Sequence, residues 1–82
     1  MTKATAYSIL RVRQALVQIE TLAKEDARTG RFSAARKKHA ENAWDTLRCH
    51  LPKLGVETPQ RSVYYDLADD LKRIAPLQER FR

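Results

Sequence analysis

The first 29 residues contain neither proline nor glycine, the two residues that most often interrupt a helix. Within this stretch, apolar side chains recur at alternating intervals of three and four residues: Ile9, Val12, Leu16, Ile19 and Ala23. That spacing places them on one side of an α-helix. We therefore predict a long amphipathic helix over residues 4–28, with Gly30 as the left-handed residue that follows its end.

A second helix is predicted over residues 33–50. Ser33 is a suitable N-cap, and Pro52 should end the helix because the residue before a proline is disfavoured in the helical region. Its apolar stripe contains Ala40, Ala43, Trp44, Leu47 and Leu51. We expect Trp44, the only tryptophan, to anchor the core.

A third helix is predicted over residues 59–74. Thr58 is placed as its N-cap and Pro59 as its first residue, an arrangement typical of helix starts. We expect Pro76 to break the helix, after which residues 76–82 either add one short packed turn or fray.

Three amphipathic helices joined by short links predict an all-α fold, a small three-helix bundle with antiparallel neighbours. The length of 82 residues predicts a single domain, 1–82. A domain of this size buries little surface, so an alternative is a helical pair that completes its core as a homodimer.

Composition favours an intracellular protein. The chain has one cysteine, which suits a reducing compartment, and its N-terminus lacks the apolar segment of a signal peptide. No apolar run approaches the roughly 18 residues of a membrane span. We therefore predict a cytoplasmic location and no membrane partner.

The net charge of +6 is concentrated in the middle of the chain. Between residues 28 and 40 there is no acidic residue, and the basic ones are Arg28, Arg31, Arg36, Lys37 and Lys38. Cations at a helix N-terminus oppose the helix dipole, which suggests that these serve a partner. Phosphate groups of a nucleic acid or an acidic protein surface would both fit. A helix-turn-helix is disfavoured, since position 36 should then be apolar.

Three apolar or aromatic residues lie off the core stripes. Leu10 and Val17 are one heptad apart on another side of the first helix, and Tyr65 lies opposite the stripe of the third. Leu10 and Val17 either widen the face that contacts two neighbouring helices or form an interface with a partner or second copy. Tyr65 is either incidental or a binding anchor.

The sequence offers little for catalysis, metals or cofactors. His39 and His50 would be about 16 Å apart along the second helix, so we predict no metal site and expect both on the surface. We expect Cys49 to be partly buried and Asp66 and Asp70 to lie on a solvated face. No nucleotide-binding loop or nucleophile motif is present, so we predict no cofactor and no enzymatic activity.

These observations lead to two hypotheses about function. The first is a small basic helical protein that binds nucleic acid through the five residues between 28 and 38. The second is a protein-binding adaptor or small inhibitor that docks its basic or apolar surface on an acidic protein, which could itself handle nucleic acid.

Overall fold

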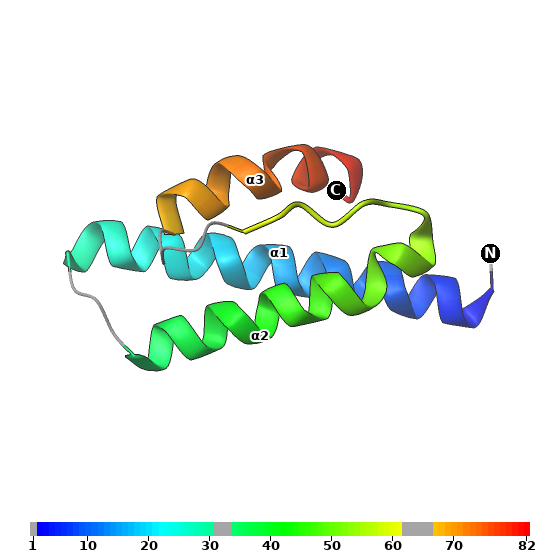
Figure 1. Ribbon diagram of the computed structural model, residues 1–82, viewed down its shortest axis with the longest axis horizontal. Coiled ribbons are helices and arrows are strands. Elements are labelled where there is room, and N and C mark those ends of the chain that lie inside the picture. Colours follow the sequence, from blue (N-terminus) through cyan, green and yellow to red (C-terminus); the bar gives the residue numbers. More distant parts are fainter. Residues whose placement is uncertain (1, 31–33, 62–66) are drawn as a thin grey trace.

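The computed structural model describes residues 2–30, 34–61 and 67–82, and these form helices and their connections. The elements are α1 (Lys3–Thr29), α2 (Ala34–His50), the short 3₁₀ helix η1 (Pro52–Leu54) and α3 (Leu67–Arg80). The predicted all-α bundle of three helices is confirmed (Figure 1). Four residues that carried predictions lie outside the described residues: Arg31, Ser33, Tyr65 and Asp66.

Helix α1 runs the full length of the molecule. The side chain of Thr2 accepts a hydrogen bond from the backbone N–H of Thr5 at 3.1 Å, which caps the first turn. At the other end Gly30 has φ of 63°, as predicted, and its N–H donates to the carbonyl of Asp26. A helix of 27 residues is about 40 Å long, which matches the longest dimension of 42 Å.

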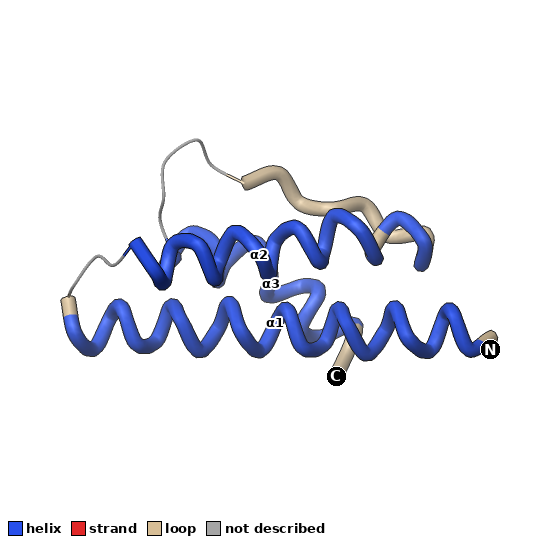
Figure 2. The backbone as a smooth tube through the Cα atoms, turned by 90° about the horizontal axis from the view of Figure 1, so that it is seen from below, coloured by secondary structure: helices blue, strands red, loops and turns tan. Residues whose placement is uncertain are grey.

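Helices α2 and α3 both pack against α1, on adjacent flanks of it: α3 lies above and α2 below α1 in Figure 1, and Figure 2 shows α2 lying along α1. Each runs antiparallel to α1, so α2 and α3 run in the same direction (Figure 1). The two pairs that pack, α1 with α2 and α1 with α3, are antiparallel as expected, whereas the described parts of α2 and α3 make no close backbone contact with each other. After α2 the chain turns at Gly55, with φ of 71°, and must return along the bundle before α3 can begin.

This return path explains why the third helix begins later than predicted. Thr58 and Pro59 do not start a helix, because residues 56–61 form a crossover without regular secondary structure (Figure 1). An extended chain covers about 3.3 Å per residue and a helix only 1.5 Å. The crossover can span the bundle in few residues only if it is not helical, so the predicted bounds 59–74 are wrong.

The third helix also continues past Pro76, which we expected to break it. Proline lacks the N–H that would bond the carbonyl four residues earlier, and this weakens the helix. The apolar stripe continues on the far side of the proline, however. Ile74 is fully buried, Leu77 is 6% exposed and Phe81 packs against the core from the end of the helix. Burial of these side chains on α1 offsets the lost hydrogen bond.

The core lies between α1 and the two helices that cover it. Its main cluster consists of Val12, Ala15, Leu16, Ile19, Ala43, Trp44, Leu47, Leu51, Ile74 and Leu77. Trp44 is fully buried, as predicted from the stripe of α2. Cys49 is exposed rather than partly buried, since it lies on the side of α2 that faces away from the core.

A buried ion pair joins the crossover to α3. The guanidinium of Arg61 lies 3.1 Å from the carboxylate of Asp70, which is 1% exposed, and also sits 5.9 Å from the centre of the Trp44 ring. We expected Asp70 on a solvated face, and that prediction is wrong. The crossover brings Arg61 onto Trp44, and the first turn of α3 then places Asp70 against it.

His50 is buried at the end of α2, whereas His39 is exposed as expected. Its Nδ1 shares a hydrogen bond of 3.0 Å with the hydroxyl of Ser8, and the Tyr7 ring meets it edge-on at 5.7 Å. Burial is the main cause that lowers the pKa of His50, and the nearby cations Lys53 and Arg11 lower it further.

The Asp70–Arg61 pair should dominate the electrostatic stability of the fold. Asp70→Asn leaves a buried guanidinium without its carboxylate, and we expect the free energy of unfolding to fall by about 3 kcal/mol. The matched control is Asp69→Asn, which removes the half-exposed neighbour paired with Arg73 and should cost less than about 1 kcal/mol. Urea denaturation measures both. Equal losses would contradict the structural role of the buried pair.

His50 should make the protein less stable at mildly acidic pH. Because its pKa is lower in the folded chain, the unfolded chain binds the proton more readily, so stability is full above the ordinary histidine pKa of about 6.5 and falls as the pH drops below it. Urea midpoints at pH 7.5 and pH 5 measure the effect. We expect His50→Gln to reduce this pH dependence and His39→Gln to preserve it. If the urea midpoint of His50→Gln still fell as much as that of the wild type between pH 7.5 and pH 5, His50 would not be the group responsible.

Candidate functional site

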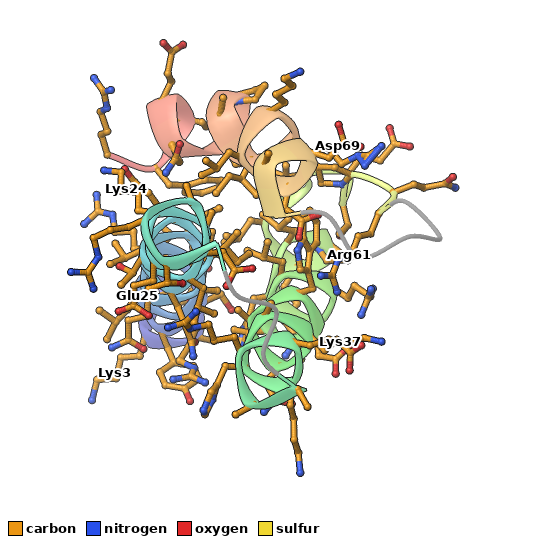
Figure 3. The ribbon with its side chains drawn as sticks, turned by 90° about the vertical axis from the view of Figure 1, so that its left-hand side faces the viewer. Lys3, Lys24, Glu25, Lys37, Arg61 and Asp69 are labelled. Carbon is orange, nitrogen blue, oxygen red and sulfur yellow. The ribbon has the colours of Figure 1, made fainter. Side chains whose placement is uncertain are left out.

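The predicted basic residues occupy one end of the molecule, where α1 ends and α2 begins. Arg28 lies in the last turn of α1, and Lys37 and Lys38 lie in the first turns of α2. All three are exposed, and none forms an ion pair within the described residues. Figure 3 views this end of the molecule and shows Lys37 pointing away from α1. Arg31, the fourth member, lies outside the described residues.

Arg36 does not share this exposed position. Its Nη1 lies 3.2 Å from the Asp26 carboxylate and donates to the Thr29 hydroxyl at 3.0 Å, while its Nε lies 3.7 Å from Glu25. Its cation also faces the C-terminal end of α1, which the helix dipole makes negative. Arg36 therefore holds α2 to α1, and the charge available to a partner at this end is smaller than the sequence suggested.

The sequence contains a signal for this contact that we did not use. In a helical hairpin, residues at similar distances before and after the turn face each other. Asp26 is four residues before Gly30, and Arg36 is six residues after it. A helix-turn-helix also requires residue 36 to face the first helix, but with an apolar side chain. A basic side chain at this position can instead pair with a carboxylate on the first helix.

Three large apolar or aromatic side chains are exposed along α1, on and beside its outer face, the face that lies opposite the core. They are Tyr7, Leu10 and Val17, which are 57%, 51% and 62% exposed. Leu10 lies about 180° around the helix from the fully buried Ile19. The interpretation that Leu10 and Val17 widen the face toward a third helix is therefore wrong, because both face solvent. Their role as an interface stays a prediction.

A groove lies beside Val17, between α1 and the end of α3. It has a volume of about 370 Å³. Its apolar lining comes from Leu16, Val17 and Phe81, and its polar lining from Arg13, Glu20, Gln78 and Arg82. The sequence did not predict this groove, since Phe81 reaches it only because α3 continues past Pro76.

Polar contacts across the groove hold its two walls together. Arg13 donates from Nε to the carbonyl of Phe81 at 2.7 Å and from Nη2 to the carbonyl of Arg82 at 2.9 Å. The side chain of Gln78 donates to Glu20 at 2.9 Å. Each of these contacts joins α1 to the end of α3, so the shape of the groove is set by the fold.

The charge around the outer face of α1 is positive. Glu20 pairs with Lys24 at 2.8 Å, a contact that lowers the pKa of the Glu20 carboxyl and keeps it ionised. Glu25 pairs with Arg36, as described above. Lys3, Arg11 and Arg28 on α1 form no ion pair within the described part of the chain, whereas Arg13 is held by the oxygens of Phe81 and Arg82. Figure 3 shows Lys3 and Lys24 on the α1 side of the bundle.

The described residues hold no group of three or more histidine, cysteine or acidic side chains arranged to bind a metal ion. None of their helices combines the length and apolar character that crossing a membrane requires.

Comparisons with protein-family models, with curated proteins and with solved structures found no match to this chain. The interpretation of the site therefore depends on its geometry and charge.

The outer face of α1 should contribute little to folding. We expect Leu10→Ala to change the free energy of unfolding by no more than about 0.5 kcal/mol, because Leu10 has no core contacts to lose. The same substitution at Leu16, which is 4% exposed, should cost about 3 kcal/mol. Urea denaturation of the two variants measures the difference. A large loss in Leu10→Ala would show that Leu10 serves the fold rather than a partner.

Proposed function

We propose that this protein is a non-enzymatic binding module that docks a protein partner on the outer face of α1. The observation that carries the proposal is the exposure of Tyr7, Leu10 and Val17 along one helix. Single apolar residues scattered over a protein surface are normal, but several large ones spaced along one helix are typical of an interaction site.

The energetics of this face also favour a partner. Fully burying a leucine or valine side chain contributes roughly 1.5–3 kcal/mol, and that contribution is absent while these residues face water. Arg11 and Arg13 lie on the same helix and would speed association with an acidic surface. The face thus combines apolar anchors with a charge that selects among partners.

Nucleic-acid binding is a second candidate function. It is favoured by Arg28, Lys37 and Lys38, which are exposed, and by the net charge of +6. Three phosphate contacts would give a slope of about −2.7 in a plot of log K against log salt concentration, a modest and sequence-independent affinity. Because Arg36 is engaged by Asp26, this surface has less free charge than the sequence suggested.

Site-specific photocrosslinking distinguishes the two candidates. A photoreactive residue is introduced at position 17 on α1 or at position 38 on α2, and each protein is irradiated in an extract of the organism that encodes it. We expect position 17 to crosslink a discrete protein and position 38 to give none, because only position 17 lies on the docking face. Leu10→Gln should reduce the crosslink from position 17.

The opposite pattern would favour nucleic acid. Crosslinks to DNA or RNA from position 38, with none to protein from position 17, would contradict the proposed function. Fluorescence anisotropy with short oligonucleotides then measures the salt slope. Lys37→Gln combined with Lys38→Gln should reduce that slope by about 2 if these side chains contact phosphates.

A further inference from the structure

We infer that the partner segment is an acidic amphipathic helix that lies along α1 and places an apolar side chain in the groove beside Val17. This inference rests on the proposed function, because it assigns the chemistry of the partner to the same face. It depends on three properties of that face: the spacing of its side chains, the groove and the distribution of charge.

The spacing fits a helix packed along α1. Five exposed residues follow one another at intervals of three, four, three and four: Tyr7, Leu10, Gln14, Val17 and Thr21. This is the spacing of a seam between two packed helices. The seam covers about 21 Å of α1, or four turns. Two of the five residues, Gln14 and Thr21, are polar, and a polar residue at the centre of such a seam, here Gln14, defines the register of the partner.

The groove supplies a place for one apolar anchor of that helix. Val17 belongs to both the seam and the groove lining, so the two surfaces are continuous. The contacts of Arg13 with the carbonyls of Phe81 and Arg82 hold the groove walls in place without a partner. A preformed groove reduces the ordering cost of binding, and buried anchors in such pockets provide much of the affinity of an interface.

The charge identifies the partner as acidic. Arg11 and Arg13 lie on the two sides of the seam, next to Leu10 and Gln14, where flanking charges determine which helix is accepted. Arg11 donates a hydrogen bond to the neutral side chain of Gln14 at 3.0 Å, a contact that leaves its charge unneutralised. Nε and Nη2 of Arg13 are already engaged by the oxygens of Phe81 and Arg82. An acidic side chain on the flank of the partner helix would therefore pair with Arg11.

The same charge argues against two other occupants. A second copy of this chain would bring the same arginines, together with Lys3 and Arg28, against each other, and like charges across an interface are costly. A nucleic acid would pair with the arginines but would leave Leu10 and Val17, which lie between them, without an apolar contact.

Two synthetic peptides test the inference on the full chain. Both form four helical turns with leucine at the seam positions; one carries glutamate on both flanks and the other carries lysine. We expect titration calorimetry to show binding of the glutamate peptide, weakened by added salt, and no binding of the lysine peptide. Chemical shifts in NMR spectra should change at Val17 and Phe81 on addition of the glutamate peptide.

Substitutions then test each element separately. Arg11→Glu should weaken the glutamate peptide about fivefold and allow the lysine peptide to bind, since the pairing is exchanged. Leu10→Gln should weaken binding at least about tenfold. The matched control is Lys38→Glu, which reverses a charge on α2 away from the seam and should leave the dissociation constant unchanged. Circular dichroism confirms that each variant is folded.

Each of the following results would overturn the inference. Equal binding of both peptides, or no effect of Arg11→Glu, would show that charge does not select the partner. A dimer detected by light scattering and dissociated by Leu10→Gln would make the occupant a second copy. If position 17 crosslinks a protein but the glutamate peptide does not bind, the acidic helix is wrong and the proposed function stands. If position 17 crosslinks no protein and the glutamate peptide does not bind, the inference and the proposed function both fail.

Discussion

The structure depends on the packing of both α2 and α3 against α1, on two adjacent flanks of it. One apolar stripe on α1 contributes to the core shared with both helices, so the opposite side of α1 has no neighbour among the described elements. Because both helices run antiparallel to α1, the chain between them must return along the bundle. That return places Arg61 on Trp44 and against Asp70, and it delays the start of α3. The exposed face of α1 and the late third helix thus have one cause.

The basic residues of this protein fall into two groups that composition does not separate. Arg36 and Arg61 are engaged by carboxylates and hold elements of the fold together. Arg11, Lys37 and Lys38 keep their charge exposed to a partner or only partly covered. The net charge of +6 therefore overstates the strength of the patch at the junction of α1 and α2. The net charge also does not indicate that some of the basic residues, such as Arg11, lie beside the apolar seam of α1.

Much of the fold could be predicted because helical periodicity is a local property. The bounds of α1 and α2, the cap at Gly30 and the burial of Trp44 follow from spacing and capping chemistry. The wrong predictions for His50 and Asp70 involve contacts between distant residues. His50 is buried by Ser8 and Tyr7, which are more than 40 positions away, and Asp70 is buried by a crossover that was expected to be helical. Periodicity within α2 or α3 contains no information about these neighbours.

The sequence by itself determined that the chain forms amphipathic helices, which side of α1 faces a core, and that Leu10 and Val17 lie off that side. Only the tertiary structure decided that this second side stays uncovered, that Arg36 is paired and that Phe81 completes a groove with α1. The physical reason is that an apolar stripe specifies that a helix face is buried but not what buries it. The partner of each face depends on the path of the connections, here the return of the chain between α2 and α3.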